Sequence, residues 1–395
     1  MESTLSLDAC LQEALNKRRD QSLYRERAVL ESAQKIRLQK NGKEYLSFCS
    51  NDYLGLANHP AVVAAFIKAA HQYGVGSGAS HLICGHSQEH HQLEEELAAF
   101  TGRKRALLFS TGYMANQGVI NALTSREDAV FQDRLDHASL IDGAMLSPAK
   151  FLRYHHNDMA GLEKLLAKQT ARRKLIVVDG VFSMDGDFAE LPNICELAKK
   201  YNAWTMVDDA HGIACVGKQG GGICERFSLT ENEVPILVGT LGKAFGTFGA
   251  FVAGSEALIE SLIQFSRPYI YTTALPPAIA AATRESLRIV IQEPERRQYL
   301  DDLIQYFRKA CSELQIELMP SETAIQPIVI GEAALALKVS QALEVRGIWV
   351  SAIRPPTVPQ GSSRLRITLT AEHQKSDVDK LLSTLTEVLN AECHT

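Results

Sequence analysis

The sequence lacks the features that mark membrane-spanning and exported proteins. No apolar run approaches the roughly eighteen residues that a membrane helix needs. The N-terminus has no positively charged start followed by an apolar block, and acidic residues stand among its arginines, so we expect neither a secretory signal nor an organelle transit peptide. The eight cysteines form no CxxC pair, which argues against a disulfide framework or a zinc site of that kind. These absences together favour a reducing, cytoplasmic compartment.

The sequence also lacks an excess of basic residues. Its 41 lysines and arginines stand against 46 aspartates and glutamates, which gives a formal net charge of -5. Because this balance provides no electrostatic footprint for nucleic acid, we expect no nucleic-acid partner. The 395 residues are enough for a large core and two lobes, and the hydrophobic content of 46% is ordinary for a globular protein.

What the chain does contain is a repeated order of strand, small-residue turn and helix. Strands are predicted at 106–109, 129–133, 151–154, 236–240 and 250–253, and at the start of 174–186 and of 204–212. This alternation predicts an α/β fold with a mostly parallel sheet and helices on both faces. In such sheets ligands bind beyond the carboxyl ends of the strands, and the polar residues considered below follow those ends.

The predicted elements divide the chain into three parts. Residues 1–50 form an N-terminal helix and arm, residues 51–283 a large domain, and residues 284–395 a small C-terminal α/β domain. A long helix from Pro277 to about Ile291 is expected to join two lobes. Further helices are expected at 60–73, 88–101, 332–346 and 376–391, and further strands at 325–330, 347–353 and 364–370.

A glycine-rich segment and a histidine cluster lie between the first two helices of the large domain and just beyond. The segment 74–80 is no dinucleotide fingerprint, because it follows a helix and lacks the third glycine. We interpret it as a loop near a ligand or a subunit contact. His86, His90 and His91 have no Cys or Asp partner at ligand spacing, so we interpret them as surface or core residues and expect no metal.

Lys243 stands in a glycine-rich loop directly after a predicted buried strand. Gly239, Gly242 and Gly246 flank it, so backbone or a flat ligand can approach closely. A lysine amine in such a loop can serve as a nucleophile or a base. The alternative is a strand-to-loop turn that carries an incidental lysine.

Other strand ends carry a complementary set of groups. Asp208 follows an apolar run, so its buried carboxylate needs a cation, and His211 can bind an oxygen beside it. A metal site built from Asp208, Asp209 and His211 is the alternative. The amides of Gly112 and Tyr113 open a helix and form an anion site.

Two further side chains complete this set. Thr240 offers a hydroxyl, and His137 either stacks on a flat ring or caps the next helix. A flat ring with a cationic nitrogen, an oxygen, a phosphate and a carbonyl for a lysine describes pyridoxal 5'-phosphate (PLP).

Eight segments in order along the chain carry a family resemblance. They are 50–56 (SNDYLGL), 110–113 (STGY), 136–139 (DHAS), 179–186 (DGVFSMDG), 207–212 (VDDAHG), 240–243 (TLGK), 271–273 (YTT) and 364–370 (RLRITLT). With them the chain resembles the α-oxoamine synthases, fold-type-I PLP enzymes that join an amino acid to an acyl thioester with loss of CO2. The resemblance implies a PLP-binding large domain at 51–283 and a homodimer with shared active sites.

The segment 352–359 (AIRPPTVP) is most similar to family members that condense L-alanine with a pimeloyl thioester, bound to CoA or to acyl-carrier protein. The alternative is a sister enzyme that uses glycine or serine with another acyl thioester. Taken alone, Arg354 is compatible with a surface arginine in a proline-bounded loop. Arginine is nonetheless the residue type that captures a carboxylate with two hydrogen bonds, and prolines would hold it in place.

The resemblance also implies a role for each matching residue. Lys243 is the covalent anchor and base, Asp208 the partner of the ring nitrogen, His211 a partner of the ring oxygen and His137 the stacking residue. Gly112, Tyr113, Thr240 and Ser183 contact the cofactor, and Thr273 reaches the cofactor phosphate of the partner subunit. Asn51 and Arg354 bind the amino-acid carboxylate, and Arg25 and Thr357 contact the acyl substrate.

A few positions depart from the family pattern. His81, Cys84 and His86 replace other residue types in the glycine-rich loop, and Ile213 stands where a small hydroxyl residue is common. A cofactor-binding scaffold without activity is a further alternative, but such proteins lose the lysine or the arginine that this chain retains.

Overall fold

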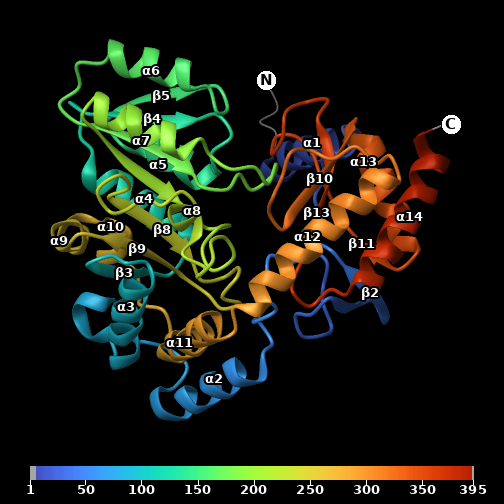
Figure 1. Ribbon diagram of the computed structural model, residues 1–395, viewed down its shortest axis with the longest axis horizontal. Helices are drawn as coiled ribbons and strands as arrows, with labels where there is room; N and C mark the ends of the chain where they lie inside the picture. The colour runs from blue at the N-terminus through green and yellow to red at the C-terminus, as the bar shows by residue number, and fades with distance from the viewer. Residues whose placement is uncertain (1–5, 394–395) are drawn as a thin grey trace. The chain divides into compact units, whose positions relative to one another are not determined.

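The structure is a computed structural model that describes residues 6–393 and divides into two compact units (Figure 1). One unit runs from Asn51 to Leu300. The other combines the described residues up to Ser50 with those from Asp301 onward. Among the described residues, no helix is both long and apolar enough to cross a membrane.

A seven-stranded sheet forms the centre of the Asn51–Leu300 unit, with the order β3-β9-β8-β7-β6-β4-β5. Its strands are β3 (Arg105–Phe109), β4 (Ala129–Asp133), β5 (Lys150–Tyr154), β6 (Lys174–Asp179), β7 (Ala203–Asp208), β8 (Ile236–Thr240) and β9 (Ala250–Gly254). Only β9 runs antiparallel to its two neighbours. The predicted α/β class with a mostly parallel sheet is therefore confirmed.

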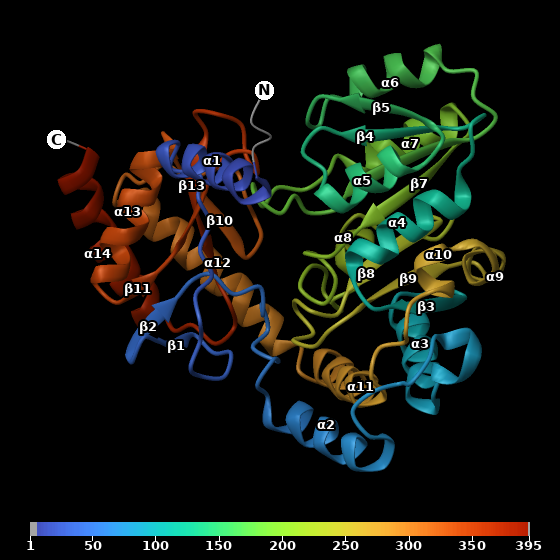
Figure 2. The same cartoon turned by 180° about the vertical axis from the view of Figure 1, so that it is seen from behind.

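Alternation along the strands produces two hydrophobic cores, one on each face of the sheet. In β6, Leu175 and Val177 enter one core, whereas Ile176 and Val178 enter the other. Successive side chains of a strand point to opposite faces, so this strand is buried on both sides. Figure 2 shows α4 (Gly112–Leu123) and α5 (Ala138–Leu146) along the first face. The second core includes α6 (Met159–Lys168), α7 (Leu191–Lys200) and α8 (Gly222–Arg226).

The remaining helices of this unit lie around the sheet. They are α2 (Pro60–Tyr73), the π-helical turn η1 (His81–Gly85), α3 (Gln88–Phe100), α9 (Glu256–Phe265), α10 (Arg267–Ile270) and α11 (Pro277–Gln292). Proline at the first position starts both α2 and α11, because its missing N–H costs nothing there. Helices α2 and α11 lie side by side in both views (Figures 1 and 2).

The second unit contains two small sheets. Strands β1 (Arg37–Lys40) and β2 (Lys43–Ser47) pair with β11 (Ile348–Trp349), and β10 (Ile325–Gly331) and β12 (Ser351–Ile353) flank β13 (Ser363–Thr368). Its helices are α1 (Leu7–Asp20), α13 (Ala333–Val345) and α14 (Lys375–Cys393). The predicted strand 347–353 is thus two strands, and each joins a different sheet.

The helix that contains the unit boundary is α12 (Glu295–Glu313). The expectation that α11 joins two lobes is corrected, because α11 lies wholly within the Asn51–Leu300 unit. Pro294 separates the two helices, since the residue before a proline is driven out of the helical conformation.

One partly buried ion-pair cluster predicts a pH dependence of stability. His156 Nε2 lies 2.8 Å from Asp187 Oδ2, and His156 Nδ1 lies 3.2 Å from Asp133 Oδ2. Burial alone would lower the pKa of His156, but the hydrogen bonds and charges of the two carboxylates outweigh it and raise the pKa to about 9.

The pKa of His156 is higher in the folded state than the unfolded value of 6.5, so its contacts with the two carboxylates stabilise the fold fully below pH 6.5. This stabilisation is lost as the pH rises through about 9. We therefore expect His156→Gln to lower the urea midpoint most near pH 6 and least near pH 10. The exposed neighbour variant His155→Gln serves as control. A His156→Gln deficit that stays constant across this pH range would contradict the prediction.

Candidate active site

Lys243 lies in the loop between β8 and β9, where close packing leaves room only for glycine at several positions. A Cβ at Gly239 would lie 2.5 Å from the Phe251 ring, and one at Gly246 would lie 2.2 Å from the Ala57 nitrogen. Gly246 also has a φ of +66°, which an L side chain rarely adopts. The glycines therefore allow the loop to pack closely against its neighbours, which fixes the backbone position of Lys243.

A chain of hydrogen bonds leads away from the lysine amine. Lys243 Nζ lies 3.0 Å from His211 Nε2, and His211 Nδ1 lies 2.6 Å from the Tyr53 hydroxyl. Tyr53 in turn donates to Asn51 Oδ1 at 3.3 Å. The directions agree when the ammonium donates to His211 Nε2 and the ring donates from Nδ1 to Tyr53. His211 is thus held in one tautomer, and the buried Tyr53 fixes the orientation of its ring.

Asp208 ends β7 and is only 4% exposed. Its Oδ2 accepts from Asn116 Nδ2 at 2.6 Å, and its Oδ1 accepts from the Ala210 amide at 3.0 Å. These two donors orient the carboxylate without supplying a full positive charge. A buried carboxylate in this setting fits a cationic partner such as a protonated ring nitrogen.

The neighbouring Asp209 serves a different purpose. It is fully buried, and its Oδ2 accepts from the Ile223 amide at 2.8 Å. Burial above all raises its pKa well above the ordinary value. Within residues 6–393, three groups of side chains have donor atoms close enough together to hold a metal ion. None of these groups combines Asp208, Asp209 and His211. The alternative of a metal site there therefore has no geometric support.

His137 lies at the N-terminus of α5 and performs the capping role considered above. Its Nδ1 accepts from the Ser139 amide at 3.3 Å, and its own amide donates to Asp179 Oδ2 at 2.7 Å. Burial lowers the pKa of His137, against the opposing charge of Asp208. A neutral imidazole with an exposed ring is suited to lie against a flat ring. Ser139 Oγ also joins His137 to Asn116, and so to Asp208.

The N-terminus of α4 lies against the end of β8. The Thr111 side chain caps the helix by accepting from the Met114 amide at 3.2 Å. The first two amides, of Gly112 and Tyr113, lie where helix geometry provides no acceptor. A Cβ at Gly112 would lie 2.8 Å from Thr240 Cγ2, so only glycine allows this approach. The two predicted phosphate contacts and Thr240 are thereby brought together.

Two other predicted residues lie in loops of the same unit. Ser183 is half-buried in the segment after β6. Thr273 forms an isolated bridge with Ser80, and its carbonyl accepts from Ser110 Oγ at 3.3 Å. The bridge joins Thr273, which is predicted to reach the cofactor of the partner subunit, to the glycine-rich segment 74–80.

The remaining predicted substrate residues lie in the second unit. Arg354 donates from Nη1 to the Ser22 carbonyl and from Nη2 to the Tyr24 carbonyl at 3.4 Å. Arg25 Nη2 donates to Thr357 Oγ1 at 3.2 Å. Burial, followed by the nearby charge of Arg25, lowers the pKa of Arg354. Residues 22–25 and the loop at 354–357 therefore meet, and two guanidinium groups gather there.

Sequence reasoning gave no role to Tyr53, Asn116 or Ser139. All three are buried to 1% exposure and connect predicted site residues. Each stands in or next to a motif that carried the resemblance, and a polar residue in such a motif is the signal that identifies a positioning role. Asn116, four residues after Gly112, follows the face of α4 that meets the strand ends.

The residues fit PLP in chemistry and shape. They provide an amine for its aldehyde, a carboxylate for its ring nitrogen, a histidine for its ring face and a helix N-terminus for its phosphate. The space that Gly112 leaves before Thr240 is a cradle that a larger side chain would fill.

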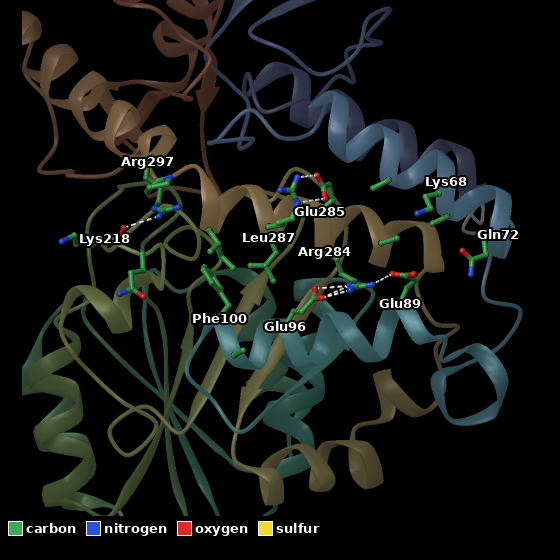
Figure 3. Close-up of a pocket in the computed structure, with 18 residues that line it drawn as sticks. Lys68, Gln72, Glu89, Glu96, Phe100, Lys218, Arg284, Glu285, Leu287 and Arg297 are labelled. Atoms are coloured by element: carbon green, nitrogen blue, oxygen red, sulfur yellow. Dashed lines mark hydrogen bonds and ion pairs between the residues drawn. The ribbon is translucent and has the colours of Figure 1, made fainter.

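A cavity of about 1080 Å³ elsewhere in this unit contains none of these residues. Figure 3 shows its lining side chains from α2, α3 and α11. Arg284 lies between Glu89 and Glu96, with an N–O distance of 2.7 Å to each. Arg284 and Arg288 of this lining thus form ion pairs with glutamates.

Comparison with known proteins gives one consistent result. The family Aminotransferase class I and II matches residues 43–385. The chain is 62% identical to an 8-amino-7-oxononanoate synthase of Saccharophagus degradans over 387 residues, which cover 98% of each chain.

Solved structures agree with this match. A serine palmitoyltransferase from S. paucimobilis with a bound PLP–myriocin aldimine superposes with a TM-score of 0.93 at 30% identity and covers 100% of both chains. An 8-amino-7-oxononanoate synthase from Francisella tularensis superposes with a TM-score of 0.76 at 33% identity, over 88% of this chain and 98% of that one. The fold therefore recurs in proteins of known architecture.

Proposed function

We propose, from the premise that the chain belongs to the 8-amino-7-oxononanoate synthases within the class I and II aminotransferase family, that it condenses L-alanine with a pimeloyl thioester. The products are 8-amino-7-oxononanoate, CO2 and the free thiol, in biotin biosynthesis. The observation that carries the proposal is the pairing of Lys243 with His211 at 3.0 Å, beside the buried carboxylate of Asp208.

The enzyme depends on PLP, which supplies an aldehyde for an amine and a ring that draws electrons from the carbon beside that amine. Asp208 would hold the ring nitrogen protonated, with Asn116 fixing the carboxylate. The amides of Gly112 and Tyr113, together with Thr240, would hold the phosphate. His137 would cover the ring face, and Ser183 would contact the ring-oxygen side.

Lys243 performs two tasks in this proposal. Its amine first anchors the cofactor and then, once displaced by L-alanine, takes the proton from Cα. His211 lies at hydrogen-bond distance from Nζ and can accept or return that proton while Tyr53 holds the ring. The deprotonated carbon attacks the thioester carbonyl, and the thiolate leaves and takes up a proton. The alanine carboxylate then departs as CO2, and a proton is returned to the carbon in its place.

The substrate groups are assigned from the family resemblance, and the charge of Arg354 supports its assignment. The Arg354 guanidinium is always charged and can donate two parallel hydrogen bonds to the alanine carboxylate, for which Asn51 would be a second partner. Arg25 and Thr357, which bond to each other, would contact the acyl chain. Thr273 would reach the cofactor phosphate of a partner subunit, so we propose a homodimer with shared sites.

We also propose a cytoplasmic location. The described cysteines, Cys10 to Cys311, are all free thiols, as a reducing compartment favours.

The amino-acid substrate separates this proposal from its main alternative, a sister enzyme that uses glycine or serine. The high structural similarity to serine palmitoyltransferase favours that alternative, but the 62% identity to an 8-amino-7-oxononanoate synthase outweighs it. With pimeloyl-CoA, we expect L-alanine to give a kcat/KM at least about tenfold above that of glycine or serine, since a pocket discriminates one carbon or hydroxyl by about 1–3 kcal/mol.

The measurement is thiol release, with the product mass confirmed by mass spectrometry. Pimeloyl-acyl-carrier protein is tested in parallel to decide between donors. Faster turnover with glycine or serine would overturn the alanine assignment but leave PLP dependence intact.

A further inference from the structure

Four histidines and a carboxylate gather at the start of α3, outside the site described above. Within residues 6–393, His86, His91 and Glu94 each offer one donor atom, and these atoms lie within 4.8 Å of one another. His91 and Glu94 are three residues apart on one helix and so face the same side. The sequence shows no Cys or Asp partner at ligand spacing for these histidines, and the fold supplies a carboxylate in Glu94.

The distances are close to those of a metal site. His86 Nε2 lies 3.9 Å from Glu94 Oε2. Tetrahedral ligands at about 2.1 Å from zinc lie roughly 3.4 Å apart, so a small side-chain movement closes the difference. Two imidazoles and a carboxylate match the donor set of open zinc sites, with water in the fourth position.

The surrounding contacts orient these donors. Glu94 Oε1 accepts from the Leu108 amide at 2.9 Å, which directs Oε2 toward His86. His81 Nδ1 lies 2.9 Å from His86 Nδ1. When His86 Nδ1 donates this bond to His81, the lone pair of His86 Nε2 is available to a metal. Glu95 Oε1 lies 3.4 Å from His91 Nε2. Such outer partners fix ring orientation in metal sites.

The fourth histidine of the group has another role. His90 Nε2 donates to the Leu275 carbonyl at 2.6 Å, and its Nδ1 accepts from the Ser87 amide at 2.9 Å. With both nitrogens engaged, His90 fixes the start of α3 rather than a ligand position.

The helix that carries two of the donors is also held in place. Arg284 of α11 bonds to Glu89 and Glu96 of α3 (Figure 3).

We propose that His86, His91 and Glu94 bind one divalent transition-metal ion, for which Zn²⁺ suits the donors best, and that the ion fastens the loop after η1 to α3. The site goes beyond the proposed reaction and requires none of its residues.

The test is metal binding by the PLP-loaded enzyme, first freed of metal by chelator and dialysis. Titration with Zn²⁺ against a chromophoric chelator should give one ion per chain. His91→Gln and Glu94→Gln should each lower the affinity at least about 100-fold, because losing a ligand costs more than losing an outer partner. Zn²⁺ should raise the Tm of the wild type and not that of His91→Gln. His91 is exposed, so this variant should fold.

Two control variants locate the ion. His71→Gln removes an exposed histidine from α2, and His156→Gln removes the histidine of a second cluster with Asp185 and Asp187. Both should bind Zn²⁺ as the wild type does. No binding at micromolar free Zn²⁺, or unchanged affinity in His91→Gln, overturns the site. Neither result bears on turnover, so the proposed reaction is judged separately.

Discussion

Lys243→Ala is expected to lower kcat on the order of 10⁴-fold while leaving the protein folded and able to bind PLP without a covalent bond. The reason is that one amine performs both the anchoring and the proton transfer, and alanine can do neither. His211 remains in this variant, but we expect that it cannot replace the amine, because it would not anchor the cofactor and its hydrogen-bond partner Lys243 Nζ would be gone.

The assay is thiol release from the acyl donor under saturating L-alanine. Lys218→Ala is the matched control, because Lys218 is exposed and also lies in a glycine-rich loop of the same unit. It should retain wild-type turnover. A Lys243→Ala enzyme within tenfold of wild type would refute the assignment of the lysine.

Asp208→Asn is the second substitution with a large expected effect. The change keeps the shape but removes the negative charge that would hold the ring nitrogen protonated. We expect kcat to fall by about 10²- to 10³-fold, the scale of removing one preorganised electrostatic partner. Asn116 and the Ala210 amide donate to the two carboxylate oxygens. The asparagine oxygen can still accept from the Ala210 amide, but its NH2 group then faces Asn116, whose side-chain amide must turn over to accept from it.

The neighbouring carboxylate provides the control for this substitution. Asp209→Asn removes another buried charge, but its partner is the Ile223 amide, which belongs to α8. We expect kcat to stay within about tenfold, with any loss appearing in the unfolding midpoint instead. Equal losses of kcat in the two variants would mean that burial of charge, and not the contact with the ring, explains the effect.

Much of this fold follows from local sequence. The apolar runs at 129–133 and 236–240 are strands with these bounds, and Pro60–Tyr73 is a helix with these bounds. Buried strands and proline-started helices are encoded by neighbouring residues, so no distant contact is needed to recognise them. The same holds for site residues at strand ends, since parallel strands deliver them to one edge of the sheet.

What was missed depends on contacts between distant segments. The pairing of β2 with β11 joins residues about three hundred positions apart, and no local pattern encodes it. Tyr53 and His211 are 158 positions apart in sequence, but the Tyr53 hydroxyl lies 2.6 Å from His211 Nδ1. Glu94 reads as one of several glutamates on a solvated helix, and only the fold shows its Oε2 directed toward His86.

The most direct measurement concerns the bond between the cofactor and the lysine. The purified enzyme with PLP should show a visible absorption band that borohydride removes, and peptide mapping should then find the reduced cofactor on Lys243. Addition of L-alanine before borohydride should reduce the labelling of Lys243. A protein that stays colourless with PLP, or that carries the reduced cofactor on a different lysine, would contradict the account.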